Sequence, residues 1–141
     1  MNTEITNNID FNISKPQIAD YWELFESTGW NNGYKFTIDE LNLAIENSWY
    51  SVSAYKNKKL IGYGRIISDG IHHALIVDLI ITPEHKSKGI GSEILRRLLK
   101  KCTDNNIRDI QLFSAKDKFV FYEKFGFKKR NENAPGMGYK Y

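Results

Sequence analysis

Apolar residues recur along the chain with two different periods. Alternation at residues 9–14, 50–55 and 60–67 predicts strands, and the polar residues 56–59 between the last two predict a hairpin. Residues 74–81 are apolar on both faces, which is typical of a strand in the middle of a sheet. Two further strands are expected at 110–113 and in a terminal segment from Met137 to Tyr141.

Four other segments repeat at the helical period. The first has Pro16 in its first turn, and the second begins with a capping box of Thr37 and Glu40. The third covers 90–102 and the short fourth covers 118–125. The order of strands and helices predicts an α/β fold, in which about four helices flank the faces of one mixed sheet.

Length and composition restrict the class of protein. At 141 residues the chain is expected to form a single domain over 1–141. Its one cysteine, Cys102, excludes a disulfide framework and a cysteine zinc site. Residues 1–10 lack the basic start and apolar run of a signal peptide, and no stretch approaches the roughly 18 apolar residues of a membrane span. We therefore expect a cytoplasmic protein with no membrane partner.

The charge is mild and well mixed. Twenty basic and 17 acidic residues give a net charge of +3, which does not argue for nucleic acid as a partner. A basic stripe could still serve a nucleic-acid-binding module, although its helical members would lie on the solvent face of the third helix, where charge is the default. The stripe consists of Lys86, Lys88, Arg96, Arg97, Lys100 and Lys101.

A glycine-rich turn leads from the buried strand into the third helix. After the strand ends at Ile81, Pro83 breaks it, and Gly89 and Gly91 open the helix. Free backbone amides at a helix N-terminus suit a phosphate or pyrophosphate, and glycine permits its close approach. A simple tight loop into a helix would look the same. The segment lacks the third glycine of a dinucleotide fingerprint, and the chain has no P-loop.

Two motifs then resemble one family. Residues 83–95, PEHKSKGIGSEIL, are similar to the acyl-CoA signature of the GCN5-related N-acetyltransferases (GNAT), usually Gln/Arg-x-x-Gly-x-Gly/Ala. Residues 121–127, FYEKFGF, resemble the family's later aromatic motif. Segments at 29–30, 47–48, 60–70 and 135–137 look like the branch of plant serotonin N-acetyltransferases and their bacterial relatives.

The resemblance implies a mixed, mostly antiparallel sheet that is splayed at an acyl-CoA site. It implies direct transfer of the acetyl group of acetyl-CoA to a primary amine, with a small amine as partner, no metal, and a monomer or homodimer. The strand edge would bind pantetheine through three residues, and the backbone amides of the turn would hold the pyrophosphate. These residues are Leu79, Ile80 and Ile81 on the strand, and Lys86, Ser87, Lys88, Gly89, Ile90, Gly91 and Ser92 in the turn.

Catalytic roles are implied for an amide and two side chains. The amide of Leu79 or Ile80 would polarise the thioester carbonyl. Tyr122 would contact the cofactor and protonate the departing thiolate, although it could instead pack among phenylalanines. Asp78, the only charge in its strand, could bind the amine or act as a water-relayed base, or could have a structural role in pairing with Arg65 or capping a helix.

Two adjacent histidines, His72 and His73, are alternative bases, but they follow the turn at Gly70 and are expected in an exposed loop. We expect no metal there, because neighbours on a strand point to opposite faces and no acidic or cysteine partner stands at ligand spacing.

The acceptor is the least defined part of the site. The first two helices and their loop are rich in aromatic residues, of which Trp30 and Tyr34 are the candidate substrate contacts. Such a wall suits an aromatic amine, although many of these residues must also be core. The alternatives are acetylation of a protein amine, or an acyl-CoA sensor without turnover.

The chain departs from the family motif at three positions. Lys86 and Ser87 replace the usual Gln or Arg and Gly, which still permits amide contacts. Ala115 replaces a frequent asparagine that contacts CoA, and Ser114 or Lys116 could compensate.

Overall fold

The computed structural model describes residues 8–140, which form two compact units. The first unit ends at Gln111 and the second begins at Leu112, and each is described by itself. Most of the N-terminal segment 1–10, for which no signal peptide is expected, lies outside the described residues. No helix among residues 8–140 is long and apolar enough to cross a membrane.

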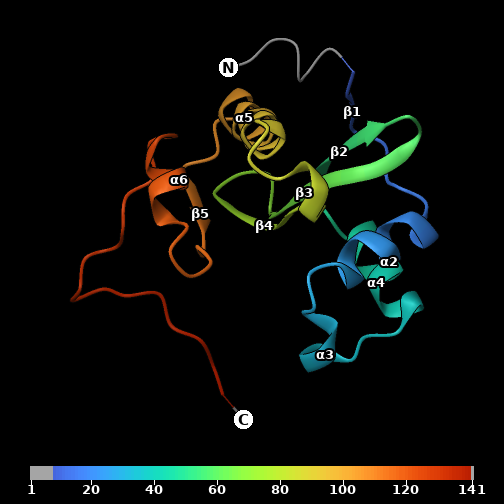
Figure 1. Cartoon of the computed structure of the whole chain (residues 1–141). Helices are drawn as coiled ribbons and strands as arrows, with labels where there is room; N and C mark the ends of the chain where they lie inside the picture. The colour runs from blue at the N-terminus through green and yellow to red at the C-terminus, as the bar shows by residue number, and fades with distance from the viewer. Residues whose placement is uncertain (1–7, 141) are drawn as a thin grey trace. The chain divides into compact units, whose positions relative to one another are not determined.

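A five-stranded sheet has its strands in sequence order, β1 to β5 (Figure 1). The first four pair antiparallel, and β4 lies between β3 and β5, as its apolar sequence predicted. Their bounds are β1 Asp10–Asn12, β2 Tyr50–Lys56, β3 Lys59–Ser68, β4 His73–Ile81 and β5 Asp109–Leu112.

Strand β5 makes the sheet mixed. The amides of Arg108 and Asp109 donate to the carbonyl of His72 at 3.1 and 2.8 Å, so β4 and β5 begin side by side. Because they start at the same end, the two neighbours run parallel. A helical crossover joins them, as parallel pairing requires. The predicted mixed, mostly antiparallel sheet is therefore confirmed.

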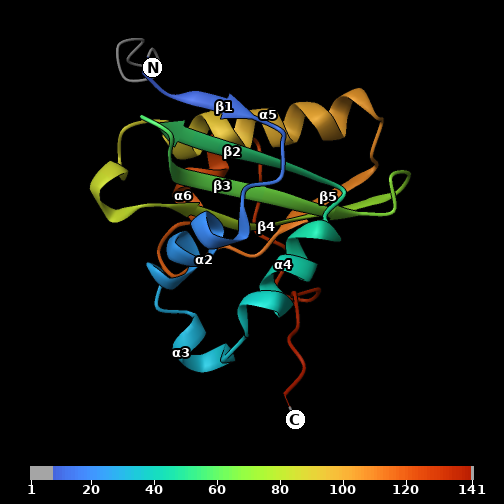
Figure 2. The same cartoon turned by 90° about the vertical axis from the view of Figure 1, so that its right-hand side faces the viewer.

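Helices cover both faces of the sheet in the first unit. Helices α2 (Ile18–Glu26) and α4 (Ile38–Glu46) lie on one side and α5 (Ile90–Asp104) on the other, as Figure 2 shows. A four-residue helix, α3 (Asn31–Tyr34), was not predicted. Its local anchor is Asn31, whose side chain bonds both the amide and the carbonyl of Phe36.

The core on the α2 side is partly aromatic. Tyr21 of α2 meets Tyr63 of β3 edge-on, with ring centroids 4.8 Å apart. The other buried members of this cluster are Leu24, Phe25, Leu41, Ile45, Leu60 and Ile80. Burial of these side chains gives α2 and α4 their position on the sheet.

Two glycines of β3 set the distance of α5 from the opposite face. A Cβ at Gly64 would lie 2.9 Å from Ile94 and 3.0 Å from Leu98, and a Cβ at Gly62 would lie 3.0 Å from Ile81. Ile94 and Leu98 are completely buried. The helix therefore lies closer to β3 than any larger residue at these positions would permit.

Local sequence signals predicted the start of α4 correctly and the position of Pro16 relative to α2 incorrectly. The capping box of Thr37 and Glu40 is present in both directions, so α4 begins where predicted. Pro16 is not in the first turn of α2, which begins at Ile18 after an extended Gln17. The proline instead precedes the cap, where its fixed φ suits the extended chain.

The second unit contains one short helix, α6 (Phe119–Glu123), within the predicted range 118–125. The predicted strand from Met137 is wrong for the residues described, because no strand is present between 128 and 140. Turns occupy the approach to it: Ala134 donates to the carbonyl of Asn131 at 2.8 Å, and Pro135 has no N–H to give to a ladder. Tyr141 lies outside the described residues.

Candidate active site

A β-bulge interrupts β4 at its only charged residue. Tyr63 pairs with Ile80 and Arg65 with Val77, so three steps on β4 match two on β3. Asp78 has a φ of 54°, a left-handed conformation that costs energy for any residue except glycine and is least costly for Asp and Asn. A bulge leaves its extra residue outside the ladder, so it frees backbone polar groups at Asp78 and Leu79.

The same part of β4 also has an open edge. Strand β4 has nine residues and β5 has four, so at least five residues of β4 have no β5 partner. Because the two strands begin together, this free edge is the half that contains Leu79, Ile80 and Ile81. An edge of this kind can pair with an extended ligand that carries amides.

Asp78 pairs with Arg65, as its structural interpretation expected. Arg65 Nε donates to Asp78 Oδ2 at 2.7 Å, and its guanidinium also reaches the carbonyl of Ala44 at 3.2 Å. The Asp78 side chain keeps 24% of its surface exposed, against 13% for Arg65. The second carboxylate oxygen is not used in this pair, so the carboxylate can still accept a hydrogen bond from a cation or water.

Two tyrosines next to this ion pair were not singled out from the sequence. Burial raises the pKa of Tyr21, and the negative charge of Asp78 raises it further; burial likewise raises the pKa of Tyr63. The Tyr63 hydroxyl is buried without a hydrogen-bond partner among residues 8–140, although the hydroxyls of Ser48 and Ser51 lie near enough to lower its pKa slightly. The signal in the sequence was position alone: Tyr63 stands two residues from Arg65 on one strand.

The glycine turn ends in an uncapped helix N-terminus. Gly89 is the N-cap of α5 with a φ of 85°, and it provides no side-chain acceptor for the first amides. A Cβ at Gly89 would meet nothing within 4 Å, so the space above it is open. Since the first amides of a helix have no partner within the helix, this turn can bind an anion.

The residues before the glycine lie on the surface. Lys86, Ser87 and Lys88 are exposed, and Ser87 has a positive φ of 62°. His85 is fixed by Thr82, whose Oγ1 lies 2.8 Å from His85 Nδ1. Burial and the charge of Lys88 lower the pKa of His85, so this imidazole favours its neutral form.

Tyr122 belongs to the second unit, on α6. Its ring meets Phe121 and Phe127 edge-on, with centroids 5.0 and 6.2 Å away. Burial raises the pKa of its phenol, which is therefore protonated at neutral pH. The phenylalanine packing that was its alternative interpretation is present, and it is compatible with proton donation.

The aromatic residues of the first two helices divide into core and surface. Phe25 is buried and Trp22 packs against the same core. Trp30 and Tyr34 are exposed by 41% and 67%, and Tyr34 stacks on Phe36 at 5.2 Å. The exposed aromatic residues of this region, Trp30, Tyr34 and Phe36, all lie in the segment between α2 and α4.

The two histidines do not diverge and do have an acidic neighbour, contrary to both expectations. His72 precedes β4, and its ring stacks on that of His73 with centroids 3.7 Å apart, so the two do not point to opposite faces. Asp109 supplies the acidic partner, 3.1 Å from His73. Both histidines are exposed, as predicted, but only His72 lies in the loop, because His73 is the first residue of β4.

The basic stripe on α5 is largely matched by acids. Arg96 and Arg97 both pair with Glu93, and Lys100 pairs with Asp104 at 2.6 Å. Lys101 lies over the rings of Trp49 and Tyr50. These contacts are typical of a solvated helix face rather than of a surface that binds phosphates.

One family model matches most of the chain. The family described as "Acetyltransferase (GNAT) domain" matches residues 28–140. The chain is 31% identical over 119 residues to an uncharacterized N-acetyltransferase, ycf52, from Pyropia yezoensis, covering 82% of this chain and 67% of the relative. It is 26% identical to "Histone acetyltransferase TAP1" from Glycine max, over 85% of this chain and 55% of that protein.

A solved structure shares the fold. A Staphylococcus aureus protein of unknown function, described as a "Probable Acetyltransferase", superposes with a TM-score of 0.78. The alignment covers 94% of this chain and 99% of the other, at 24% identity. At 24% identity this likeness shows the arrangement of strands and helices, and it does not identify the amine that accepts the acetyl group.

Proposed function

The chain belongs to the GNAT family and is an acetyltransferase, and from this premise we propose that it transfers the acetyl group of acetyl-CoA to the primary amine of a small aromatic molecule. The family uses acetyl-CoA as its co-substrate. The observation that carries the proposal is the free edge of β4 beyond the bulge at Asp78, which offers amides where an acyl-pantetheine strand would pair.

The residues of the first unit fit this donor in two places. The backbone amides from Lys86 to Ser92, along the turn and into the first residues of α5, bind the pyrophosphate, and Gly89 leaves open the space that a side chain would fill. Leu79, Ile80 and Ile81 pair with the pantetheine amides. A freed amide at Leu79 or Ile80 polarises the thioester carbonyl and stabilises the oxyanion that develops there.

Proton transfers complete the reaction. The amine must lose one proton to attack, its nitrogen bonds to the acetyl carbon, and the carbon–sulfur bond breaks. Tyr122 contacts the donor and gives its phenolic proton to the departing thiolate, and the second proton that the nitrogen loses on becoming an amide restores the phenol. Burial keeps the Tyr122 phenol protonated at neutral pH, as a proton donor must be, while the raised pKa also makes it a weaker acid.

Asp78 is assigned to the amine. Arg65 binds one oxygen of its carboxylate, and the partial exposure of the side chain leaves the carboxylate accessible to an ammonium or a relay water. The proton lost by the amine passes to this carboxylate through water and then to solvent. Asp and Asn tolerate the left-handed φ at this position best, and of the two only Asp adds a negative charge for an ammonium.

The acceptor class rests on the exposed loop aromatics. Trp30 and Tyr34 offer ring faces to an apolar amine, and with the segments at 29–30, 47–48, 60–70 and 135–137 they favour the serotonin N-acetyltransferase branch. The Glycine max relative named as a histone acetyltransferase favours a second candidate, a lysine side chain of a protein.

The test is thiol release from acetyl-CoA by the purified chain. The panel contains tryptamine, serotonin, phenethylamine, spermidine, an aminoglycoside and a lysine peptide, each against a no-amine control. We expect the arylalkylamines to give the highest kcat/KM. A preference for the lysine peptide would replace the small acceptor with a protein, and turnover with spermidine or the aminoglycoside alone would refute the aromatic assignment.

A further inference from the structure

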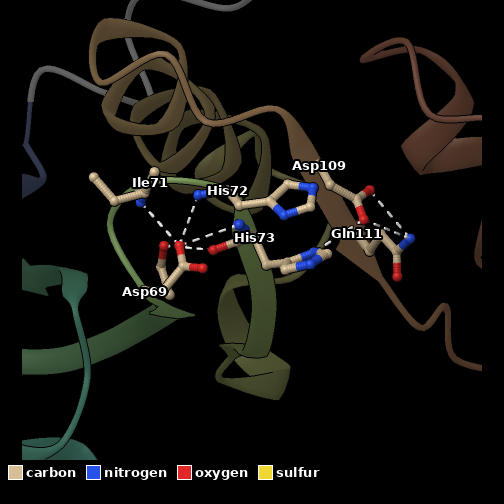
Figure 3. Close-up of polar contacts among 7 residues, drawn as sticks. Asp69, Ile71, His72, His73, Asp109 and Gln111 are labelled. Atoms are coloured by element: carbon tan, nitrogen blue, oxygen red, sulfur yellow. Dashed lines mark hydrogen bonds and ion pairs between the residues drawn. The ribbon is translucent and has the colours of Figure 1, made fainter.

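Three metal-ligating side chains meet where β4 and β5 begin. His72, His73 and Asp109 each offer one ligand atom, and these atoms all lie within 4.8 Å of one another (Figure 3). The two imidazole rings stack at 3.7 Å with a tilt of 28°. None of the three has a role in the proposed acetyl transfer.

The backbone that carries the histidines is held by one carboxylate. Asp69 Oδ1 accepts from the amides of Ile71, His72 and His73 at 2.8, 2.8 and 3.2 Å. Figure 3 shows these three bonds converging on Asp69. The turn is therefore ordered before any ligand binds, which lowers the entropic cost of binding.

The third side chain is fixed to the same turn. The carbonyl of His72 accepts from the amides of Arg108 and Asp109, so the two segments are joined directly beneath the cluster. Gln111 Nε2 donates to the Asp109 carboxylate at 3.1 Å. Such an outer hydrogen bond orients a ligating carboxylate. The nearby guanidinium of Arg108 is directed to the carbonyl of Ile71, at 3.2 Å.

We propose that His72, His73 and Asp109 form a surface binding site for a divalent first-row transition ion, with Zn²⁺ as the best fit. Two imidazole nitrogens and one carboxylate oxygen are ligands that suit Zn²⁺, Ni²⁺ and Cu²⁺, whereas Mg²⁺ and Ca²⁺ prefer oxygen alone. Because both histidines are exposed, water completes the coordination.

The spacing requires only small movements. Zinc bonds of about 2.0–2.1 Å place neighbouring tetrahedral ligands roughly 3.4 Å apart. His73 Nδ1 and Asp109 Oδ2 are already 3.1 Å apart. The His72 ligand atom lies within 4.8 Å of the other two, and rotation of its exposed ring can shorten that distance.

The site would act as a clamp rather than in catalysis. It joins the turn before β4 to the first residue of β5, at the opposite end of β4 from Ile81. His73 and Ile81 are the first and last residues of β4, eight residue steps or about 26 Å apart. Binding to the folded chain alone stabilises the fold by mass action, so the thermal midpoint should rise with Zn²⁺ concentration.

The experiment is calorimetric titration of the full, untagged chain with Zn²⁺ at pH 7.5, with Mg²⁺ as a hard-cation comparison. We expect one saturable Zn²⁺ site, and at least about tenfold weaker binding in each of His72→Ala, His73→Ala and Asp109→Asn. His85→Ala is the matched control, because His85 is the chain's only other histidine, and it should bind as the unaltered chain does.

Metal-free unfolding of each variant checks its fold. If Asp109→Asn is less stable without metal, the proposal is judged on His72→Ala instead. The His72 ring makes no hydrogen bond in Figure 3, so its removal should disturb the metal-free fold less. Absence of a saturable site, unchanged affinity in His72→Ala, or an equal loss in His85→Ala would each overturn the proposal.

Discussion

Asp78 brings a strained backbone, an ion pair and an open strand edge together at one residue. Its φ of 54° places the bulge, and Arg65 fixes one oxygen of its carboxylate. A structural role needs only the ion pair, whereas an amine-binding role needs the negative charge itself. Variants that keep the backbone shape and remove one partner at a time can separate these roles.

Asp78→Asn should raise KM for the amine by about tenfold or more and leave acetyl-CoA affinity unchanged. Asparagine tolerates the left-handed conformation, so the bulge should persist. Arg65→Gln is the control, because it breaks the same ion pair and keeps the carboxylate. Steady-state kinetics with both variants decide the matter: equal losses would mean that Asp78 acts only through its pairing with Arg65.

Tyr122→Phe should lower kcat by about 100-fold while acetyl-CoA binds nearly as before, since a general acid typically contributes that much. The ring, with its contacts to Phe121 and Phe127, is preserved. Tyr55→Phe removes another half-buried phenol, on β2, and should leave kcat unchanged. Thiol-release kinetics and calorimetric acetyl-CoA binding provide the two numbers, and an unaltered kcat in Tyr122→Phe would remove the acid from the mechanism.

Among the elements, α5 is the one whose start matters for binding. Its N-cap has a positive φ and no side-chain acceptor, which weakens the isolated helix. Burial of Ile90, Ile94 and Leu98 holds the helix in place. The sequence therefore leaves the first amides free for a ligand and stabilises the helix through packing.

Gly89→Val should weaken acetyl-CoA binding at least tenfold, or about 1.4 kcal/mol. The valine methyls would occupy the open space above the helix N-terminus and strain the backbone. Gly29→Val is the matched control, because Gly29 also has a positive φ and only Asn32 within 4.0 Å of a Cβ. Direct binding measurements should show the loss only at Gly89, and an equal loss at both positions would assign it to strain.

Elements with strong periodicity or capping could be predicted from the sequence. Thr37 and Glu40 fixed the start of α4, and the apolar run 74–81 placed β4 inside the sheet. Helix α3 could not be predicted, because it depends on the hydrogen bonds of Asn31 to a residue five positions on. The prediction of a terminal strand failed because it gave more weight to a few apolar residues near Pro135 than to the backbone N–H that proline lacks.

The site was predictable where motifs are local and not where contacts are distant. The turn at Gly89 and the isolated charge of Asp78 are visible in the sequence. The bulge is not, because it is a mismatch between two strands, and neither is the approach of Asp109 to His73 across 36 residues. Neighbouring side chains point to opposite faces only when both residues lie within a strand, and His72 lies before β4.

For the whole molecule, stability should depend on alkaline pH. Burial raises the pKa of Tyr21 and Tyr63 above the unfolded value of 10.0. The folded chain keeps these protons while the unfolded chain loses them, so the stabilisation is complete below pH 10 and is lost as pH rises further. Each buried phenol should remove about 1.4 kcal/mol per pH unit there.

Urea unfolding between pH 8 and 11 would measure this decline, and Tyr21→Phe should reduce its slope relative to the unaltered chain. Comparing the two chains is necessary because lysines also lose protons in this range, including Lys100 in its pair with Asp104. A slope that is the same in both chains would show that Tyr21 ionises as readily in the folded chain as in the unfolded chain.

The single domain over 1–141, the cytoplasmic location and the oligomeric state stay predictions.

The two glycines of β3 also limit how this chain can vary. A Cβ at Gly64 would lie 2.9 Å from Ile94 and 3.0 Å from Leu98, so both side chains would have to shift, and they belong to the helix whose first turn is assigned to the phosphates. Alanine at Gly64 would therefore be selected against through two separate phenotypes, lower abundance and weaker donor affinity. In a saturation library of β3, functional clones should retain glycine at 64 while the exposed Ile67 accepts many residues.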